Sequence, residues 1–353
     1  EGTPCGVEGV VSLQSPYTFR LSGRTDKLFL ASFLAPRFEA YPEGLEVSAG
    51  VTFRLEGSAE DLAGLVGEGS IKGLTVTLGG GLLVESSEVR WKWQENRLVV
   101  PDARFSGKGT DFVLSGWAAP AARELSFEAD GEVNLALLQF WDAPAELGGT
   151  AAVELNVFGG FDSPRIVGTC ELDGLQFGSS EWPVQIRDGE GRIRFTAGQI
   201  AIDGVRLESE YGTLQLSGGV FMEGWRPQRW QVNVSGQGLR VEYPEGLESR
   251  VDADVDYVQG EGSSLVTGTI IVRSAEYRRD LTIPELVLML AGGGPSSVPR
   301  ADEPSVALDL LIQARRSLRV DNNLAELVGS ADLRVTGSIA HPVLLGTLTI
   351  EEG

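Results

Sequence analysis

The fold is decided by the stretch Val251-Asp252-Ala253-Asp254-Val255-Asp256-Tyr257, in which an apolar residue alternates with an aspartate. Successive side chains of a β-strand point to opposite faces of the sheet, so this stretch has one apolar and one acidic face. A strand of that kind is typical of an antiparallel sheet with one sheltered side and one wet side. A parallel sheet covered on both sides is therefore disfavoured.

The same alternation recurs along the chain, at residues 17–22, 51–56, 89–94, 125–130 and 230–235. Strands of ordinary length joined by short turns would give roughly 25 to 30 strands. Forty-six glycines among 353 residues suit such a chain of strands and turns. The pattern predicts an all-β fold.

Helical periodicity is brief by comparison. It appears at residues 26–33, 61–66, 134–140 and 284–291, where it predicts a few short helices that serve as lids or connectors.

Internal similarity indicates a repeat. The hexapeptide at residues 41–46, Tyr-Pro-Glu-Gly-Leu-Glu, recurs at residues 243–248. A fixed period is the signature of a repeat architecture, and further matches at half this shift predict units of about a hundred residues. The expected units are residues 1–124, 125–229, 230–303 with a Gly/Pro-rich loop at 291–304, and a partial unit at 304–353 that ends at a truncation.

Charge and cysteine content narrow the class of protein. Acidic residues outnumber basic residues 50 to 29, for a net charge of −21. Nucleic acids and anionic membrane surfaces both select clustered Lys and Arg, so we expect neither as a partner. Cys5 and Cys170 are too few for a disulfide scaffold, and the sequence leaves open whether they pair. No apolar run is long enough to span a membrane, so any anchor is expected outside this sequence.

Residues suited to catalysis are sparse. The single histidine, His341, lies in a turn-like step beside Pro342, where a structural role outweighs a role as general base. Gly79-Gly80-Gly81 and Gly292-Gly293-Gly294 lack the Lys-Ser/Thr of a phosphate loop and are predicted turns. The aspartates at 252, 254 and 256 do not have calcium-loop spacing and suit a solvated face. We expect no enzyme, no metal and no cofactor.

A long one-sided sheet must hide its apolar face in a barrel, in a sandwich, or in an open trough that a lipid fills. Repetition favours the trough, because repeated units add length and leave the cross-section constant. The residues expected to line it are the apolar alternates Val51, Phe53, Leu55, Leu74, Val76, Trp91, Trp93, Phe112, Leu114, Phe127, Val153, Leu155, Val157, Ile193, Phe195, Ile200, Ile202, Leu214, Leu216, Val232, Val234, Val251, Val255, Ile270, Val272, Leu308, Leu310, Ile312, Leu333 and Val335.

Three segments carry a family resemblance. Gly159-Gly160-Phe161-Asp162-Ser163-Pro164-Arg165-Ile166-Val167-Gly168 and Gly337-Ser338-Ile339-Ala340-His341-Pro342-Val343-Leu344-Leu345-Gly346 share a step of Gly, then Pro, then Gly. The step resembles one that recurs between strands of the TamB proteins, AsmA-like members of the bridge-like lipid transfer proteins. Residues 268–280 are similar to the segment that opens that family's C-terminal conserved region.

The resemblance implies an elongated, curled β-sheet, U-shaped in section (a β-taco), whose apolar inner face shelters phospholipid acyl chains. It further implies the periplasm of a diderm bacterium, an inner-membrane anchor, and an outer-membrane β-barrel partner of the TamA or BamA kind. The family's last strands are expected after Gly353.

Three functions stay open on this basis. The first is a conduit that conducts phospholipid tails between the two membranes, with no catalytic residue. The second is an assembly factor that holds strands of outer-membrane proteins on its sheet edges. The third is a passive β-solenoid stalk, for which the varied size of the inner residues is unfavourable.

Overall fold

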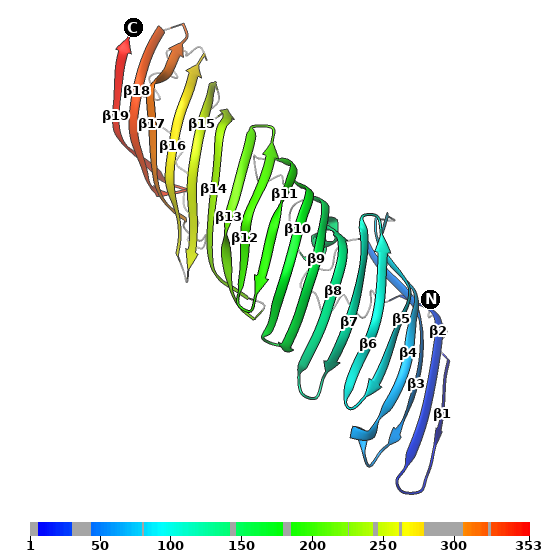
Figure 1. Ribbon diagram of the computed structural model, residues 1–353. Coiled ribbons are helices and arrows are strands. Elements are labelled where there is room, and N and C mark those ends of the chain that lie inside the picture. The colour runs from blue at the N-terminus through cyan, green and yellow to red at the C-terminus, as the bar shows by residue number, and fades with distance from the viewer. Residues whose placement is uncertain are drawn as a thin grey trace. The chain divides into compact units, whose positions relative to one another are not determined.

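The computed structural model of the chain (Figure 1) describes residues 6–29, 44–79, 81–141, 146–178, 185–224, 226–242, 246–260, 263–278, 306–323 and 326–353. It contains two compact units. Unit 1 comprises residues 1–199 and 223–225, and unit 2 comprises residues 200–222 and 226–353.

Unit 1 is a curled antiparallel sheet in which each strand pairs with the next strand along the chain. Two 3-10 helices, η2 (Leu62–Gly64) and η3 (Leu135–Trp141), lie between its strands. The strands are β1 (Gly6–Val11), β2 (Thr18–Phe29), β3 (Leu45–Ser58), β4 (Val66–Leu78), β5 (Gly81–Gln94), β6 (Arg97–Gly107), β7 (Thr110–Ala119), β8 (Glu124–Asn134), β9 (Glu146–Gly160), β10 (Pro164–Gly178) and β11 (Ile186–Thr196).

Unit 2 repeats this construction, and its strands from β14 onward also pair in chain order. The strands are β12 (Gln199–Ser209), β13 (Gly212–Glu223), β14 (Arg226–Glu242), β15 (Leu247–Gly260), β16 (Ser263–Tyr277), β17 (Val306–Asp321), β18 (Glu326–Ser338) and β19 (Pro342–Glu352). The prediction of an all-β fold with a curled antiparallel sheet is confirmed. Among the described residues there are fewer strands than estimated, because several strands run to 15 residues or more.

One strand pair departs from the antiparallel prediction. β16 and β17 run parallel, with Val266 opposite Leu308 and Ile270 opposite Ile312. Parallel neighbours cannot be joined by a tight hairpin, and the chain between them, residues 278–305, has the length that a crossover needs.

The helical predictions had mixed outcomes. Residues 61–66 contain η2, and residues 134–140 overlap η3, as expected of short connectors. The prediction was wrong at residues 26–29, which belong to β2 because strand pairing with β3 overrides the local pattern. Residues 30–33, 284–291 and the loop at 291–304 lie outside the described residues.

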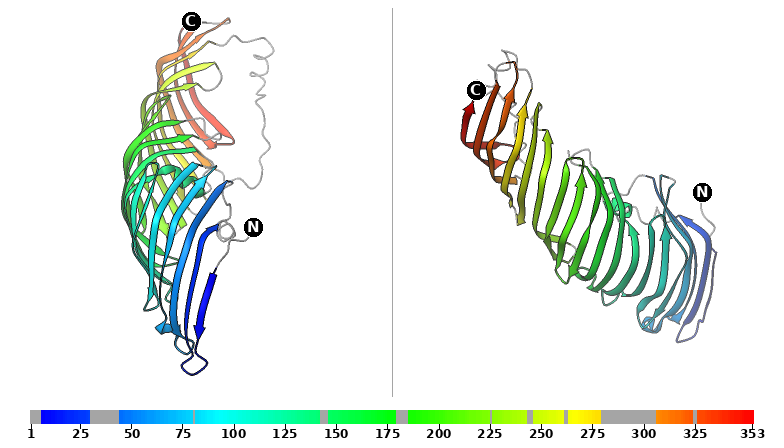
Figure 2. Two further views of the ribbon diagram at one scale, coloured as in Figure 1. Left: turned by 90° about the vertical axis from the view of Figure 1, so that its right-hand side faces the viewer. Right: turned by 45° about the horizontal axis from the view of Figure 1, so that its top comes forward.

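The strands are bent along their length, so the sheet of each unit is curled (Figure 2). An extra residue in one strand of a pair forms a β-bulge, which bends that strand and increases its twist. Shifts in register of this kind recur along the chain. They lie between Thr25 and Leu28 on β2, Val100 and Ala103 on β6, Asp173 and Gln176 on β10, Gly236 and Leu239 on β14, Val272 and Ala275 on β16, and Ala314 and Leu318 on β17. We call these positions the bulge row.

The Gly-Pro-Gly steps share one geometry. Gly159 lies opposite Pro164 at the start of the β9–β10 pair, and Gly168 lies opposite Leu155 further along it. Gly337, Pro342 and Gly346 repeat this arrangement on β18 and β19. Gly168 has a φ of 143°, and a Cβ there would collide with the carbonyl oxygen of Glu154, so only glycine fits.

The expected repeat boundaries near residues 125, 230 and 304 stay a prediction, because one compact unit can hold more than one repeat. The step geometry shared by β9–β10 and β18–β19 is consistent with repetition at the level of the hairpin.

Candidate apolar binding face

Strand register brings the apolar alternates of unit 1 to one side of its sheet. Directly opposed residues of paired strands lie on the same face. One such row crosses five strands, from Phe112 through Gly131, Val153 and Cys170 to Ile193. We call this side the apolar face of unit 1.

The predicted lining residues of unit 1 all lie on this face by register. Each is partly buried and none is exposed. They are Val51, Phe53, Leu55, Leu74, Val76, Trp91, Trp93, Phe112, Leu114, Phe127, Val153, Leu155, Val157, Ile193 and Phe195.

Unit 2 has its own apolar face, built in the same way. A row of opposed residues runs from Val255 through Gly268, Leu310 and Val335 to Leu344. The predicted residues that register places on it are Val232, Val234, Val251, Val255, Ile270, Val272, Leu308, Leu310, Ile312, Leu333 and Val335.

The remaining predicted residues lie on the first two strands of unit 2. Ile200 and Ile202 share one face of β12, and Leu214 and Leu216 share one face of β13, because each pair is two residues apart. All four side chains are partly buried.

Curling buries part of the apolar face without a second layer. Among the described residues no other sheet covers either face, yet Ala103 on the face of unit 1 is 1% exposed and Ala314 on the face of unit 2 is 2% exposed. Both lie beside the bulge row, where the strand bends and neighbouring side chains close over a small residue. Larger side chains away from the bend stay partly exposed.

Sequence reasoning missed the small residues beside the bends. They are Ala49, Ala103, Ala151, Ala275 and Ala314, each at most 5% exposed. A bulge changes which residues point to the apolar face. On β14 these are the even-numbered residues Val232 and Val234 before the bulge and the odd-numbered Leu239 after it. That change of parity next to a glycine, Gly238, is the signal that could have located the bend.

The described tryptophans differ in their surroundings. Trp91 and Trp93 lie on the apolar face opposite Gly69 and Gly67, which leave room for their rings. Trp230 is 37% exposed, while Trp182 and Trp225 lie outside the described residues. The Nε1 of Trp93 is buried and has no acceptor among the described groups.

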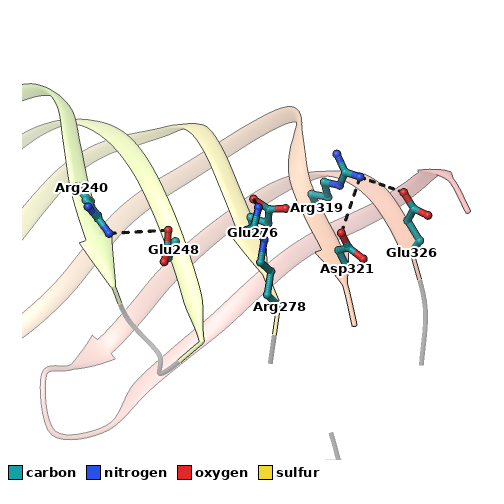
Figure 3. Close-up of polar contacts among 7 residues, drawn as sticks. All are labelled: Arg240, Glu248, Glu276, Arg278, Arg319, Asp321 and Glu326. Carbon is teal, nitrogen blue, oxygen red and sulfur yellow. Dashed lines mark hydrogen bonds and ion pairs between the residues drawn. The ribbon is translucent and has the colours of Figure 1, made fainter. Parts of the chain in front are cut away.

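The opposite face of each sheet is polar and carries cross-strand ion pairs. Arg104 donates two hydrogen bonds to Asp111, at 2.8 and 2.6 Å, and Arg334 binds Asp309 with the same two-pronged geometry. Near one set of strand ends in unit 2 (Figure 3), Arg319 lies 3.0 Å from Glu326. Exposed pairs of this kind stabilise the sheet only slightly, but opposite charges on facing strands favour the correct register.

The three aspartates of β15 are engaged by the protein itself. Asp252 accepts hydrogen bonds from Arg273 and, at 2.9 Å, from the backbone N of Gly238. These hydrogen bonds lower the pKa of Asp252 below its ordinary value, and the bond from Arg273 has the larger effect. Asn233 donates to both Asp254 and Asp256, at 2.7 and 3.1 Å. Asp254 is exposed, whereas Asp252 and Asp256 are partly buried, so the prediction of a solvated face holds only in part.

Other residues considered for chemistry occupy structural positions. His341 lies in the turn between β18 and β19, where its backbone N donates to the carbonyl oxygen of Ser338 at 3.0 Å. The described residues contain no group of three or more His, Cys, Asp or Glu side chains that could hold a metal ion. Within the same ranges, no helix has the length and apolar character needed to cross a membrane.

Comparison with known proteins gives one match. Residues 203–353 match the family model described as the TamB C-terminal domain. No curated protein and no solved structure matches the chain. The matched segment covers most of unit 2 and therefore most of its apolar face.

Proposed function

We propose, from the premise that residues 203–353 of this chain belong to the TamB C-terminal domain family, that both apolar faces bind phospholipid acyl chains. The tails would slide along the sheet while the headgroups remain in water. The observation that carries the proposal is that each unit has a one-sided apolar face, with no second layer over it in the described part of the chain.

The energetic reason is the cost of exposing a lipid to water. Each CH₂ group costs about 0.8 kcal/mol, so a two-tailed phospholipid would lose tens of kcal/mol in an aqueous gap. An apolar face that runs from strand to strand removes most of this barrier. Every strand adds a step of about 4.8 Å along the path.

The family supplies the cellular setting. TamB proteins act in the bacterial envelope, in outer-membrane protein assembly and lipid transport. We place this chain in the periplasm, between the inner membrane and an outer-membrane β-barrel partner of the TamA or BamA kind, as a carrier without catalytic residues.

The test is a contact measurement. A photo-crosslinking benzoylphenylalanine at Val153, on the apolar face, is compared with the same residue at Ala152, its exposed neighbour on the polar face. We expect phospholipid adducts, identified by mass spectrometry, at position 153 and not at 152. Equal adduct yields at both positions would remove the support for an acyl-chain path.

The rival function is a strand-holding role, in which a sheet edge accepts a strand of an outer-membrane protein by β-augmentation. Crosslinks from a sheet edge to a protein, with none from Val153 to lipid, would favour this role.

A further inference from the structure

The helical turn η3 lies on the apolar face of unit 1. β8 ends at Asn134, and the chain then turns so that Leu135 packs against Ala151 and Cys170. Leu135 is 5% exposed. The partly buried residues around this contact are Val153, Leu172, Leu175, Ile193 and Phe195. Leu135 therefore occupies surface that the proposed function assigns to an acyl chain.

The start of η3 is fixed to the neighbouring hairpin by Asn134. Its backbone N donates to Oγ1 of Thr110 at 3.0 Å, and its Nδ2 donates to the carbonyl oxygen of Lys108 at 2.7 Å. Its Oδ1 accepts from the backbone N of Ala136 at 2.9 Å, as a helix cap does. The turn thus has a firm hinge at Asn134, the last residue of β8.

Beyond Asn134, the described side chains of η3 differ in burial. Leu135 is buried, Ala136 and Leu137 are partly buried, and Leu138 is 42% exposed. Short 3-10 turns have poorer hydrogen-bond geometry than α-helices and depend on such contacts. An acyl chain carries more methylene groups than one leucine side chain, so it can replace Leu135 with a gain in buried apolar area.

We propose that η3 is a resident occupant of an acyl-chain subsite formed by Ala151, Cys170, Leu172, Ile193 and Phe195. Leu135 leaves this subsite when an acyl chain enters and returns when the chain departs. Unit 1 can then keep this part of its apolar face covered while no lipid is bound. This inference rests on the proposed function, because it assumes that the apolar face receives acyl chains.

Cys170 provides the probe, since its thiol lies within the subsite. In a Cys5→Ser background it is the sole cysteine of the chain. The test measures its labelling rate by a maleimide at constant pH, with and without dioleoyl phosphatidylcholine loaded from vesicles. The variants are Leu135→Ala and, as a matched control on the same turn, Leu138→Ala.

We expect Leu135→Ala to raise the lipid-free labelling rate at least about tenfold, because the cover over Cys170 is lost. Loaded lipid should return that rate to the parent's level. Leu138→Ala should label like the parent. If Leu135→Ala labels at the parent rate, or if bound lipid leaves its Cys170 unprotected, the inference is overturned.

Lipid extracted from the same samples separates the two proposals. No lipid bound to any variant would contradict the proposed function, whereas bound lipid without protection of Cys170 contradicts only the role of η3. If Leu135→Ala does not fold, Asn134→Ala serves instead, because it releases the hinge without emptying a core position. We expect the same labelling results for Asn134→Ala as for Leu135→Ala.

Discussion

At the scale of single residues, two kinds of position hold this sheet in shape. Glycines such as Gly168 allow neighbouring strands to approach where any side chain would collide with backbone. Charged pairs such as Arg273 with Asp252 bridge facing strands on the polar side. The first kind acts through geometry and the second through electrostatics, so they respond to different perturbations.

Gly168→Ala should destabilise the protein by more than about 1 kcal/mol, because its φ of 143° and the carbonyl of Glu154 leave no room for a Cβ. The matched control is Gly178→Ala on the same strand, where a Cβ would meet open space. Urea unfolding followed by circular dichroism measures both variants. Equal midpoints for the two would show that the strand tolerates a side chain at 168.

Asp252 predicts a pH dependence of stability. Arg273 and Gly238 lower its pKa in the folded protein below the ordinary 3.8, so its contribution is present above that value. The contribution is lost as the pH falls through the lower pKa that Asp252 has in the folded protein. Between pH 7 and about 5 the unfolding free energy should be constant with respect to this group, and below about 4 it should fall.

Asp252→Asn removes the titrating group. Its unfolding free energy should be lower than the parent's at pH 7, and the gap should narrow as the pH drops below about 4. Urea titrations at pH 3 to 7 measure the gap. A gap that stays constant over this range would mean that Asp252 makes no titratable contribution to folding.

At the scale of strands and turns, the bulge row explains why a single sheet curls. Period-two alternation predicted which side chains share a face, since that depends only on strand geometry. It did not predict where each strand bends, because one inserted residue changes parity without changing composition. The change from even-numbered to odd-numbered apolar residues between Val234 and Leu239, next to Gly238, marks the position of the bend on β14. It can be recognised once the strand register is known.

The parallel pair β16–β17 could not be predicted from the strands themselves. Val266 and Leu308 belong to equally alternating segments, which look the same in either direction. The contact of Leu135 with Cys170 was hidden for a different reason, because helical periodicity at 134–140 says that a turn exists and not what it covers.

Ala103→Leu tests the bulge row. Ala103 is 1% exposed beside the bend of β6, and a leucine there must push apart the side chains that close over it. We expect a loss of about 1–3 kcal/mol in the free energy of unfolding, from a lower urea midpoint. Ala152→Leu, on an exposed polar-face position, is the control and should change stability little. If Ala103→Leu unfolds at the parent's urea midpoint, small residues are not required at the bends.

At the scale of the whole molecule, charge and apolar area have separate roles. The net charge of −21 disfavours adhesion to anionic membrane surfaces, so under the proposed function lipid binding would come from the apolar faces. Those faces occur in both units and are built by the same register rule, so lipid capacity would be a property of each sheet and not of one pocket. A carboxylate buried on either face should therefore weaken lipid binding, because an unpaired charge in apolar surroundings is costly.

The most direct test of this account is native mass spectrometry of the purified protein, with the lipids extracted and identified from the same sample. Val255→Asp places a carboxylate on the apolar face of unit 2, and Val258→Asp places one on the opposite face, where Val258 is 37% exposed. We predict phospholipid bound to the parent and to Val258→Asp, and reduced or lost in Val255→Asp. A folded parent that carries no lipid, or a Val255→Asp variant that carries as much as the parent, would contradict it.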